Sequence, residues 1–341
     1  MKICFVISNL RGGGAERVIS VLSSHFADFY DTSLVYFEQE KPFYELNPKI
    51  NLISLKTPKN RILKILYKIF KIRKISTKHD IIISFMDTTN ILVLFSCAFL
   101  GKKIFISEHS SYDAIGFKLG LLRRIFYPFS NGLSVLSKQD FEYFNFVKNK
   151  AIIYNPFAFY KEFSEQENFN KENLIIFVGR LEDIKGCDIF LNALKIADLK
   201  DFRVEILGDG SKRSELEILA KDLGIKVKFL GSTKEIQNFY KRAKIIVSSS
   251  KSEGFSNVLI ESIYYNCIRV ATPTSGAKEL INNEIDGFLS KDFSANELAK
   301  SIKKAINANE KITQNAYKNI QNFSIENIYS KWLDLIKKGQ E

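Results

Sequence analysis

The stretch AKIIVSSSKSEGFSNVLIESIYYN (243–266) joins an apolar strand to an apolar helix through a short loop that contains glycine. Residues 243–250 are rich in isoleucine and valine, and residues 258–266 place apolar side chains at helical spacing. Glu253 lies in the loop and Glu261 in the first turns of the helix. N–H groups at a helix N-terminus attract anions, and carboxylates accept hydrogen bonds from hydroxyls. The stretch therefore predicts a site for a sugar joined to a phosphate.

The same alternation of strand and helix runs through the whole chain and predicts an α/β fold. We expect two doubly wound parallel-sheet (Rossmann-like) domains, 1–158 and 159–323, and a final helix, 324–341, that returns to the first domain. In the first half, strands are predicted at 2–8, 32–37, 51–55, 80–85, 103–108, 132–137 and 151–154. In the second half, they are predicted at 174–180, 202–208, 226–231, 244–250 and 268–272.

Composition narrows the class of protein. Four cysteines are scattered singly, which argues against disulfides and zinc and fits a reducing cytoplasm. The opening KICFVISNL (2–10) reads as a buried strand, and no run is long enough to span a bilayer. The net charge is +12, and residues 1–155 carry 22 Lys/Arg against 12 Asp/Glu. An anionic partner is therefore expected on the first half.

Two further loops in the second half point to the same edge of the predicted sheet. GRLEDIKG (179–186) places Arg180 and Lys185 after one strand, and GDG (208–210) follows the next. Open α/β sheets bind ligands at the carboxyl ends of their strands. An arginine fork with a mobile lysine charge suits a diphosphate. Each loop alone is usually only a turn, but the three motifs together favour a binding site.

GRLEDIKG, GDG and E-GFSNVLI-E together resemble the donor-site signatures of the retaining GT-B glycosyltransferases of family 4. The resemblance implies two domains facing a cleft and transfer of a sugar from a nucleotide donor. It implies that Arg180 and Lys185 bind the diphosphate, that Glu261 binds the ribose, and that Glu253 contacts the transferred sugar at the catalytic centre. The predicted donor-binding residues are Gly13, Gly14, Arg180, Lys185, Gly208, Gly254, Phe255, Ser256, Asn257, Val258 and Glu261. Because the chain has no D-x-D motif, we expect no metal and no cofactor beside the UDP-sugar substrate.

The first half adds a glycine loop and a histidine. RGGGAER (11–17) opens a helix after the first strand and is receptive to anions. A dinucleotide site looks similar, but the GGG spacing, in place of G-x-G-x-x-G, disfavours it. A lone histidine is more often structural; the resemblance places His109, in FISEHSS (105–111), near the reacting sugar as a catalytic residue. FMDTTN (85–90) also ends a strand and is expected to help bind the acceptor.

A strongly basic helix is predicted within KTPKNRILKILYKIFKIRKISTKH (56–79), which contains no acidic residue. It reads either as a packed helix with a solvated basic face, or as an interfacial helix on anionic lipid. The same stripe suits a lipid-linked pyrophosphate, whereas no recognition motif supports nucleic acid. The predicted acceptor or membrane contacts are Glu16, Arg61, Lys64, Lys68, Lys71, Lys74, Arg123 and Arg124.

Within the family, ISNLRGGGAER, SFMDTTN and SEHS resemble bacterial N-acetylgalactosamine transferases that extend polyprenyl-diphosphate-linked oligosaccharides for N-glycosylation. The resemblance implies a UDP-sugar donor and an undecaprenyl-diphosphate-linked glycan acceptor. It also implies a monomer on the cytoplasmic face of the inner membrane. Three alternatives stay open: a transferase of lipopolysaccharide core or capsule synthesis, a non-catalytic nucleotide-sugar or lipid-binding subunit, and an NAD-dependent oxidoreductase.

Overall fold

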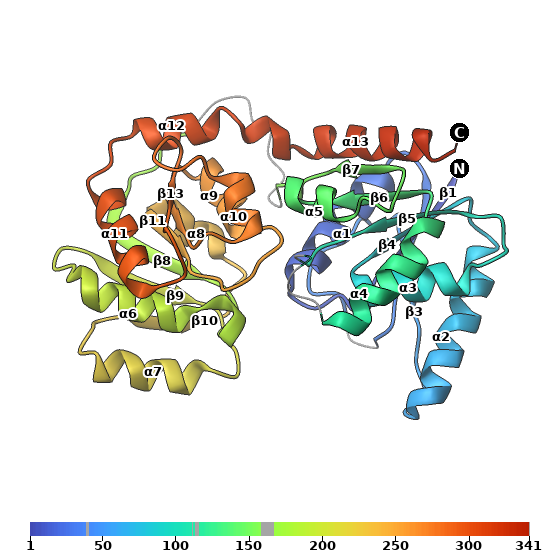
Figure 1. Ribbon diagram of the computed structural model, residues 1–341, viewed down its shortest axis with the longest axis horizontal. Helices are drawn as coiled ribbons and strands as arrows, with labels where there is room; N and C mark the ends of the chain where they lie inside the picture. The colour runs from blue at the N-terminus through green and yellow to red at the C-terminus, as the bar shows by residue number, and fades with distance from the viewer. Residues whose placement is uncertain (39–40, 111, 113–115, 158–166, 341) are drawn as a thin grey trace. The chain divides into compact units, whose positions relative to one another are not determined.

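The computed structural model describes residues 1–38, 41–110, 112, 116–157 and 167–340 (Figure 1). The chain forms two compact units, which are described separately. Unit 1 contains Met1–Tyr160 and Phe323–Glu341, and unit 2 contains Lys161–Asn322. The predicted boundary at 158/159 lies outside the described residues.

Unit 1 is built on a fully parallel sheet whose seven strands lie in the order β3-β2-β1-β4-β5-β6-β7. The order reverses between β1 and β4, so the carboxyl ends of these two strands form the topological switch point, where doubly wound sheets bind ligands. The strands are β1 (Lys2–Val6), β2 (Asp31–Tyr36), β3 (Asn51–Ser54), β4 (Ile81–Phe85), β5 (Lys103–Ser107), β6 (Gly132–Val135) and β7 (Lys150–Ile152).

Helices cover both faces of this sheet, because its strands are apolar on both sides. The helices are α1 (Gly14–Phe26), α2 (Arg61–Ser76), α3 (Asp87–Ser96), α4 (Phe117–Phe126), α5 (Lys138–Tyr143) and α13 (Ile325–Lys338), with a 3-10 turn η2 (Tyr127–Phe129). Helices α1 and α13 share one core cluster with strand residues such as Phe5 and Ile83. Trp332 of α13 lies in that cluster and is 2% exposed. The other face packs residues from α2, α3 and η2.

Unit 2 repeats the design with six parallel strands in the order β10-β9-β8-β11-β12-β13, and its switch point lies between β8 and β11. The strands are β8 (Glu172–Val178), β9 (Arg203–Leu207), β10 (Lys228–Gly231), β11 (Ala243–Ser248), β12 (Ile268–Ala271) and β13 (Phe288–Leu289). The helices are α6 (Cys187–Ala197), α7 (Arg213–Asp222), α8 (Ile236–Arg242), α9 (Asn257–Tyr264), α10 (Ser275–Leu280), α11 (Ala295–Ile306) and α12 (Lys311–Tyr317), with the 3-10 turns η3 (Asp183–Lys185) and η4 (Ile320–Phe323).

The predicted fold class of two doubly wound parallel-sheet units is confirmed. The sequence reading missed β13 and α12, because a strand of two residues shows no period and α12 is barely two turns long. Among the described residues, no helix is long and apolar enough to cross a membrane.

Candidate functional site

The switch point of unit 2 brings together a lysine and a glutamate that lie far apart in the sequence. Lys185 ends η3, in the loop after β8, and Glu253 lies in the loop after β11. The Lys185 Nζ donates to Glu253 Oε1 at 2.8 Å, and Ser250 Oγ donates to Glu253 Oε2 at 2.8 Å. Their side chains are 22% and 16% exposed. Both carboxylate oxygens are thus oriented while the pair stays reachable for a ligand.

Backbone contacts hold these two loops against each other. Gly186 adopts the left-handed conformation, with φ 62°, and a Cβ there would overlap the carbonyl oxygen of Ser249. Ser249 Oγ donates to Gly186 O at 2.7 Å, and Lys251 N–H donates to Ile184 O at 2.9 Å. Glycine at 186 is therefore what lets the Lys185 loop lie directly on the Glu253 loop.

Glu261 lies deeper than expected. It is the fifth residue of α9, it is 2% exposed, and it accepts a hydrogen bond at 2.8 Å from Tyr240 Oη in α8. Tyr240 is fully buried and stacks on Tyr265, with ring centroids 5.5 Å apart. Tyr240 could not be predicted from the sequence, because its helix is short and its contact with Glu261 joins two elements. The tyrosine fixes the direction of the carboxylate.

The remaining residues of the Glu253 loop lead into α9. Gly254, Phe255 and Ser256 are buried, whereas Asn257 and Val258, which begin the helix, are half-buried. Helix α10 supports the loop, because Gly276 N–H donates to Glu253 O at 3.1 Å. A Cβ at position 276 would lie 2.6 Å from Gly254 O, so the two backbones are in direct contact.

The two other predicted loops of unit 2 are also packed backbone to backbone. Gly208 follows β9 with φ 135°, and a Cβ there would overlap Gly179 O and lie 2.8 Å from Gly179 C. Leu181 N–H donates to Asp209 O at 2.9 Å. Packing between the loops therefore accounts for glycine at 208. Arg180 is exposed on the same loop.

In unit 1, the glycine loop after β1 is partly filled by the protein itself. Gly13 is the residue before α1, and Gly14 begins the helix. A Cβ on Gly13 would overlap the carboxylate of Glu16 and lie 2.8 Å from its Cδ. A carboxylate over the first turn interacts favourably with the helix dipole. The predicted anion-receptive loop thus carries the carboxylate of Glu16, which was expected on the acceptor side.

His109 follows β5 and stacks on Phe85, with ring centroids 4.9 Å apart and planes at 18°. Its Nε2 lies 3.0 Å from Ser107 Oγ, which accepts from Ser134 Oγ at 2.7 Å. The ring is only partly covered, yet enough protein surrounds it that desolvation lowers the pKa of His109 to about 3. At neutral pH the imidazole is uncharged, so it can exchange hydrogen bonds but cannot stabilise negative charge as a cation.

The basic helix α2 exposes apolar side chains as well as basic ones. Ile62, Leu66 and Phe70 recur every four residues and are 70%, 57% and 63% exposed. Lys68 Nζ instead lies 4.1 Å above the Phe37 ring, and burial lowers the pKa of Lys68. Lys71 is also half-buried, whereas Arg61, Lys64 and Lys74 are exposed. Both interpretations of this helix stay open, because Ile72 is buried in the core of unit 1 while most of the basic side chains and an apolar strip face the solvent.

One predicted surface cation is buried. Arg123 of α4 is 0% exposed and pairs through Nη2 with Glu108 Oε2 at 2.6 Å. It therefore does not contribute to a membrane or acceptor surface, contrary to expectation, because Glu108 draws it inward. Its neighbour Arg124 is exposed, with Cζ 5.4 Å above the Phe146 ring.

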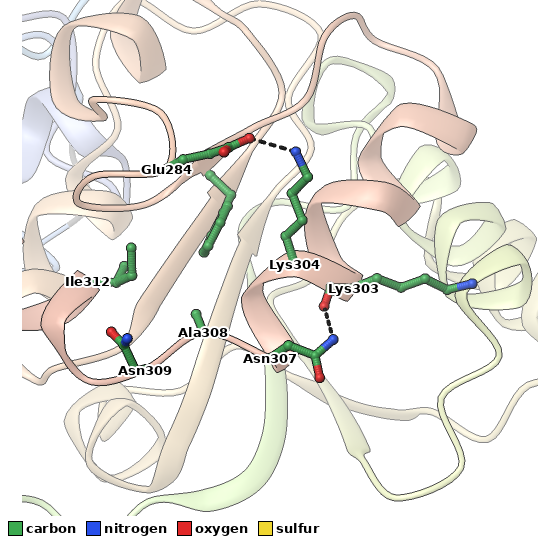
Figure 2. Close-up of a pocket in the computed structure, with 8 residues that line it drawn as sticks. Glu284, Lys303, Lys304, Asn307, Ala308, Asn309 and Ile312 are labelled. Atoms are coloured by element: carbon green, nitrogen blue, oxygen red, sulfur yellow. Dashed lines mark hydrogen bonds and ion pairs between the residues drawn. The ribbon is translucent and has the colours of Figure 1, made fainter.

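A hollow of about 570 Å³ is shown in Figure 2 and lies where α11 ends. Its wall carries the ion pair between Lys304 Nζ and Glu284 Oε1, at 2.6 Å. The hollow shares no residue with the predicted donor site.

Two doubly wound units, with paired loops at the switch point of the second, fit the GT-B class of fold. Residues 159–322 match the family described as "Glycosyl transferases group 1". A relative from Campylobacter jejuni subsp. jejuni is 36% identical over 98% of this chain and 98% of its own. It is named "GalNAc-alpha-(1->4)-GalNAc-alpha-(1->3)-diNAcBac-PP-undecaprenol alpha-1,4-N-acetyl-D-galactosaminyltransferase". The chain therefore belongs to the group 1 glycosyltransferases, and it is an enzyme.

A second relative and a solved structure are also similar to this chain. A second protein of that organism is 28% identical over 93% of both chains. Its name is "N-acetylgalactosamine-N,N'-diacetylbacillosaminyl-diphospho-undecaprenol 4-alpha-N-acetylgalactosaminyltransferase". Among solved structures, Anabaena HepE in complex with UDP-glucose covers 99% of both chains with a TM-score of 0.81 at 18% identity.

Proposed function

We propose that the protein transfers N-acetylgalactosamine from a UDP-sugar to an undecaprenyl-diphosphate-linked glycan, with retention of configuration and without a metal ion. The observation that carries this proposal is the 36% identity, along essentially the whole chain, to a transferase with such an acceptor in its name. The paired Lys185 and Glu253, and the buried Glu261, support it as a donor site at the switch point of unit 2.

The donor end of the reaction is assigned to the residues of this switch point. Arg180 and Lys185 neutralise the charge that grows on the diphosphate as the sugar leaves. The N–H groups that open α9 add partial positive charge. Glu261, held by Tyr240, accepts hydrogen bonds from the ribose, and Glu253 accepts them from the transferred sugar. These cations take the place of a metal ion, so activity should persist in EDTA.

Retention follows from attack on the face that UDP leaves. The acceptor oxygen bonds to the anomeric carbon, the bond from that carbon to the UDP oxygen breaks, and the acceptor proton passes to the departing phosphate. His109, neutral at physiological pH, contributes a hydrogen bond to a sugar hydroxyl. An NMR spectrum of the product shows the configuration directly, and a β-linked product would contradict this step.

The donor assignment is tested with Arg180→Ala and Glu261→Gln. Losing a hydrogen bond to a charged group costs roughly 1.5–3 kcal/mol, so UDP-sugar affinity should fall by roughly 10- to 100-fold. Arg203→Ala is the matched control, because Arg203 begins β9 at the opposite edge of the same sheet. Wild-type affinity in both site variants would exclude this donor site.

Helix α2 supports a membrane-bound acceptor. Ile62, Leu66 and Phe70 expose an apolar strip, Lys64 and Lys74 are exposed on the same helix, and residues 56–79 include no acidic side chain. Helix α3 packs beside α2 and α4 beside α3, and α4 exposes Leu121, Leu122 and Ile125 (Figure 1). Apolar side chains framed by basic ones suit the interface of an anionic bilayer, where each basic residue adds about 1 kcal/mol.

Vesicle flotation tests this surface. Leu66→Ser and Lys64→Glu should each weaken binding to vesicles of phosphatidylglycerol and phosphatidylcholine. The loss of binding caused by Lys64→Glu should become smaller as the salt concentration rises, because salt screens the charge. Ile218→Ser is the matched control, because Ile218 is 60% exposed on α7 of unit 2. If all three variants float as wild type does, α2 does not bind the membrane.

The acceptor itself is tested by incubating the enzyme with UDP-N-acetylgalactosamine and a short polyprenyl-diphosphate glycan, followed by mass spectrometry. We expect a mass increase of one or more N-acetylhexosamines. Transfer only to a lipid A-linked or capsule-type acceptor would replace the proposed acceptor while leaving the donor site intact.

A further inference from the structure

The switch point of unit 1 carries a carboxylate, Asp87, within the segment FMDTTN (85–90) that was expected to help bind the acceptor. Asp87 is the first residue of α3, directly after β4, and β4 lies beside β1 where the strand order reverses. Its side chain is 14% exposed. Doubly wound sheets bind ligands in the crevice outside the carboxyl ends of such strands. The position of Asp87 in the fold is therefore that of a ligand-binding group.

The backbone before Asp87 is strained. Met86 has φ 73° and ψ 142°, close to a region that is essentially restricted to glycine and costs on the order of 1–3 kcal/mol. Its N–H donates to Ser107 O at 3.1 Å, and its carbonyl accepts from Asn90 N–H at 2.8 Å. The fully buried Asn90 side chain also donates to Ser107 O at 3.0 Å. Such strain persists only where the surroundings enforce it, and here it sets the start of α3 and the position of Asp87.

A buried cation lies against the carboxylate. Arg123 Nη2 donates to Glu108 Oε2 at 2.6 Å and approaches Asp87 Oδ2 at 3.4 Å. With the described residues, Arg123 Nε and Nη1 make no hydrogen bond, although the side chain is 0% exposed. Glu108 is the better satisfied carboxylate, since Asn90 and Tyr127 both donate to its Oε1. A single buried guanidinium thus serves two carboxylates, and it holds Asp87 the more loosely.

Asp87 keeps capacity for a further hydrogen bond. Its Oδ1 accepts from Thr88 N–H at 2.6 Å, and its Oδ2 has only the long contact to Arg123 among the interactions described. An ionised carboxylate offers about four acceptor positions, so lone pairs remain on the exposed side. The charges of Asp87, Glu108 and Arg123 sum to −1, or to zero when Glu108 is protonated. In neither state is the cluster positive, so it favours a neutral hydrogen-bond donor over a phosphate.

We propose that Asp87 is a specificity-determining residue for the acceptor, whose carboxylate accepts a hydrogen bond from a hydroxyl or amide N–H of an acceptor sugar. Arg123 and Glu108 are positioning residues beneath it. The choice of an acceptor sugar as ligand rests on the proposed function. The pyrophosphate of a lipid-linked acceptor then binds away from this cluster, because the carboxylates repel it.

The test compares Asp87→Asn with wild type on whichever acceptor the wild-type enzyme uses. The acceptor KM should rise roughly 10-fold or more, while the Kd for UDP stays unchanged. Asp80→Asn is the matched control, because Asp80 is exposed just before the other end of β4. An unchanged acceptor KM in Asp87→Asn overturns the proposal. Failure of wild type on every polyprenyl-diphosphate glycan would instead count against the proposed function.

Glu108→Gln tests the positioning role separately. The amide keeps the size of the side chain but removes the charge that holds Arg123, so Arg123 should bind Asp87 and compete with the acceptor. We expect a raised acceptor KM with kcat and UDP affinity close to wild type. A fall in kcat with an unchanged acceptor KM would show that Glu108 supports the fold rather than the acceptor site, and would overturn the positioning role.

Discussion

Replacing Gly186 by alanine should destabilise unit 2 far more than replacing Gly224, although both glycines are left-handed, with φ 62° and 65°. At Gly224 a Cβ would meet nothing within 4 Å, so the cost is backbone strain alone, about 1 kcal/mol. At Gly186 the Cβ would overlap Ser249 O and lie 3.1 Å from Ser249 C. The loops must then move apart, which adds about 1–3 kcal/mol of packing cost.

Urea unfolding followed by circular dichroism measures the difference in unfolding free energy between the two variants. The slope m of each variant is compared with that of wild type, because an unchanged m shows that only stability has changed. We expect Gly186→Ala to lose about 2–4 kcal/mol and Gly224→Ala about 1 kcal/mol. Titration calorimetry with UDP supplies a second readout. Moving Ser249 away from Gly186 separates Lys185 from Glu253, so UDP affinity should fall in Gly186→Ala only. Equal stability losses in the two variants, with equal UDP affinity, would refute the argument that backbone contact holds the donor loops together.

Three further outcomes follow from buried groups. Burial lowers the pKa of His109 to about 3, so an NMR titration should show a neutral ring at pH 5, and protonation near pH 6.5 would contradict its packing. Tyr240→Phe should lose about 1 kcal/mol of unfolding free energy, more than an exposed tyrosine replaced in the same way, because Glu261 loses a donor. Desolvation raises the pKa of Glu108 from 4.5 to about 7, so the folded state retains a proton that the unfolded state has released. The free energy of unfolding should therefore fall, by up to about 3 kcal/mol, as pH rises through that window, and the difference between wild type and Glu108→Gln isolates this slope.

Much of the fold was open to prediction because its signals are local. Buried parallel strands read as apolar runs, as in residues 81–85 and 174–178, and the helices between them carry amphipathic patterns. The order of strands then follows from the doubly wound topology. The donor loops were found for the same reason, since Lys185 and Glu253 each follow such a strand directly.

The features that could not be predicted depend on partners distant in the sequence. Arg123 looked like a surface cation because its neighbours on α4 are apolar and basic; only the folded chain shows Glu108 beneath it. Tyr240 likewise reaches Glu261 from another helix. The periodicity of α2 showed an apolar strip, but not that Ile62 on this strip faces the solvent. Periodicity separates the faces of a helix, and tertiary packing decides which one is buried.

Helix α13 has a consequence for biosynthesis. Unit 1 is made from both ends of the chain, and its core includes Ile328, Trp332 and Leu335 of α13. Domains ordinarily fold in the order in which they are synthesised. Here all residues of unit 2 are synthesised before α13, so the unit that begins first is completed last. A nascent chain released before α13 would carry a finished unit 2 and an unfinished unit 1, with the apolar surface meant for Trp332 left open.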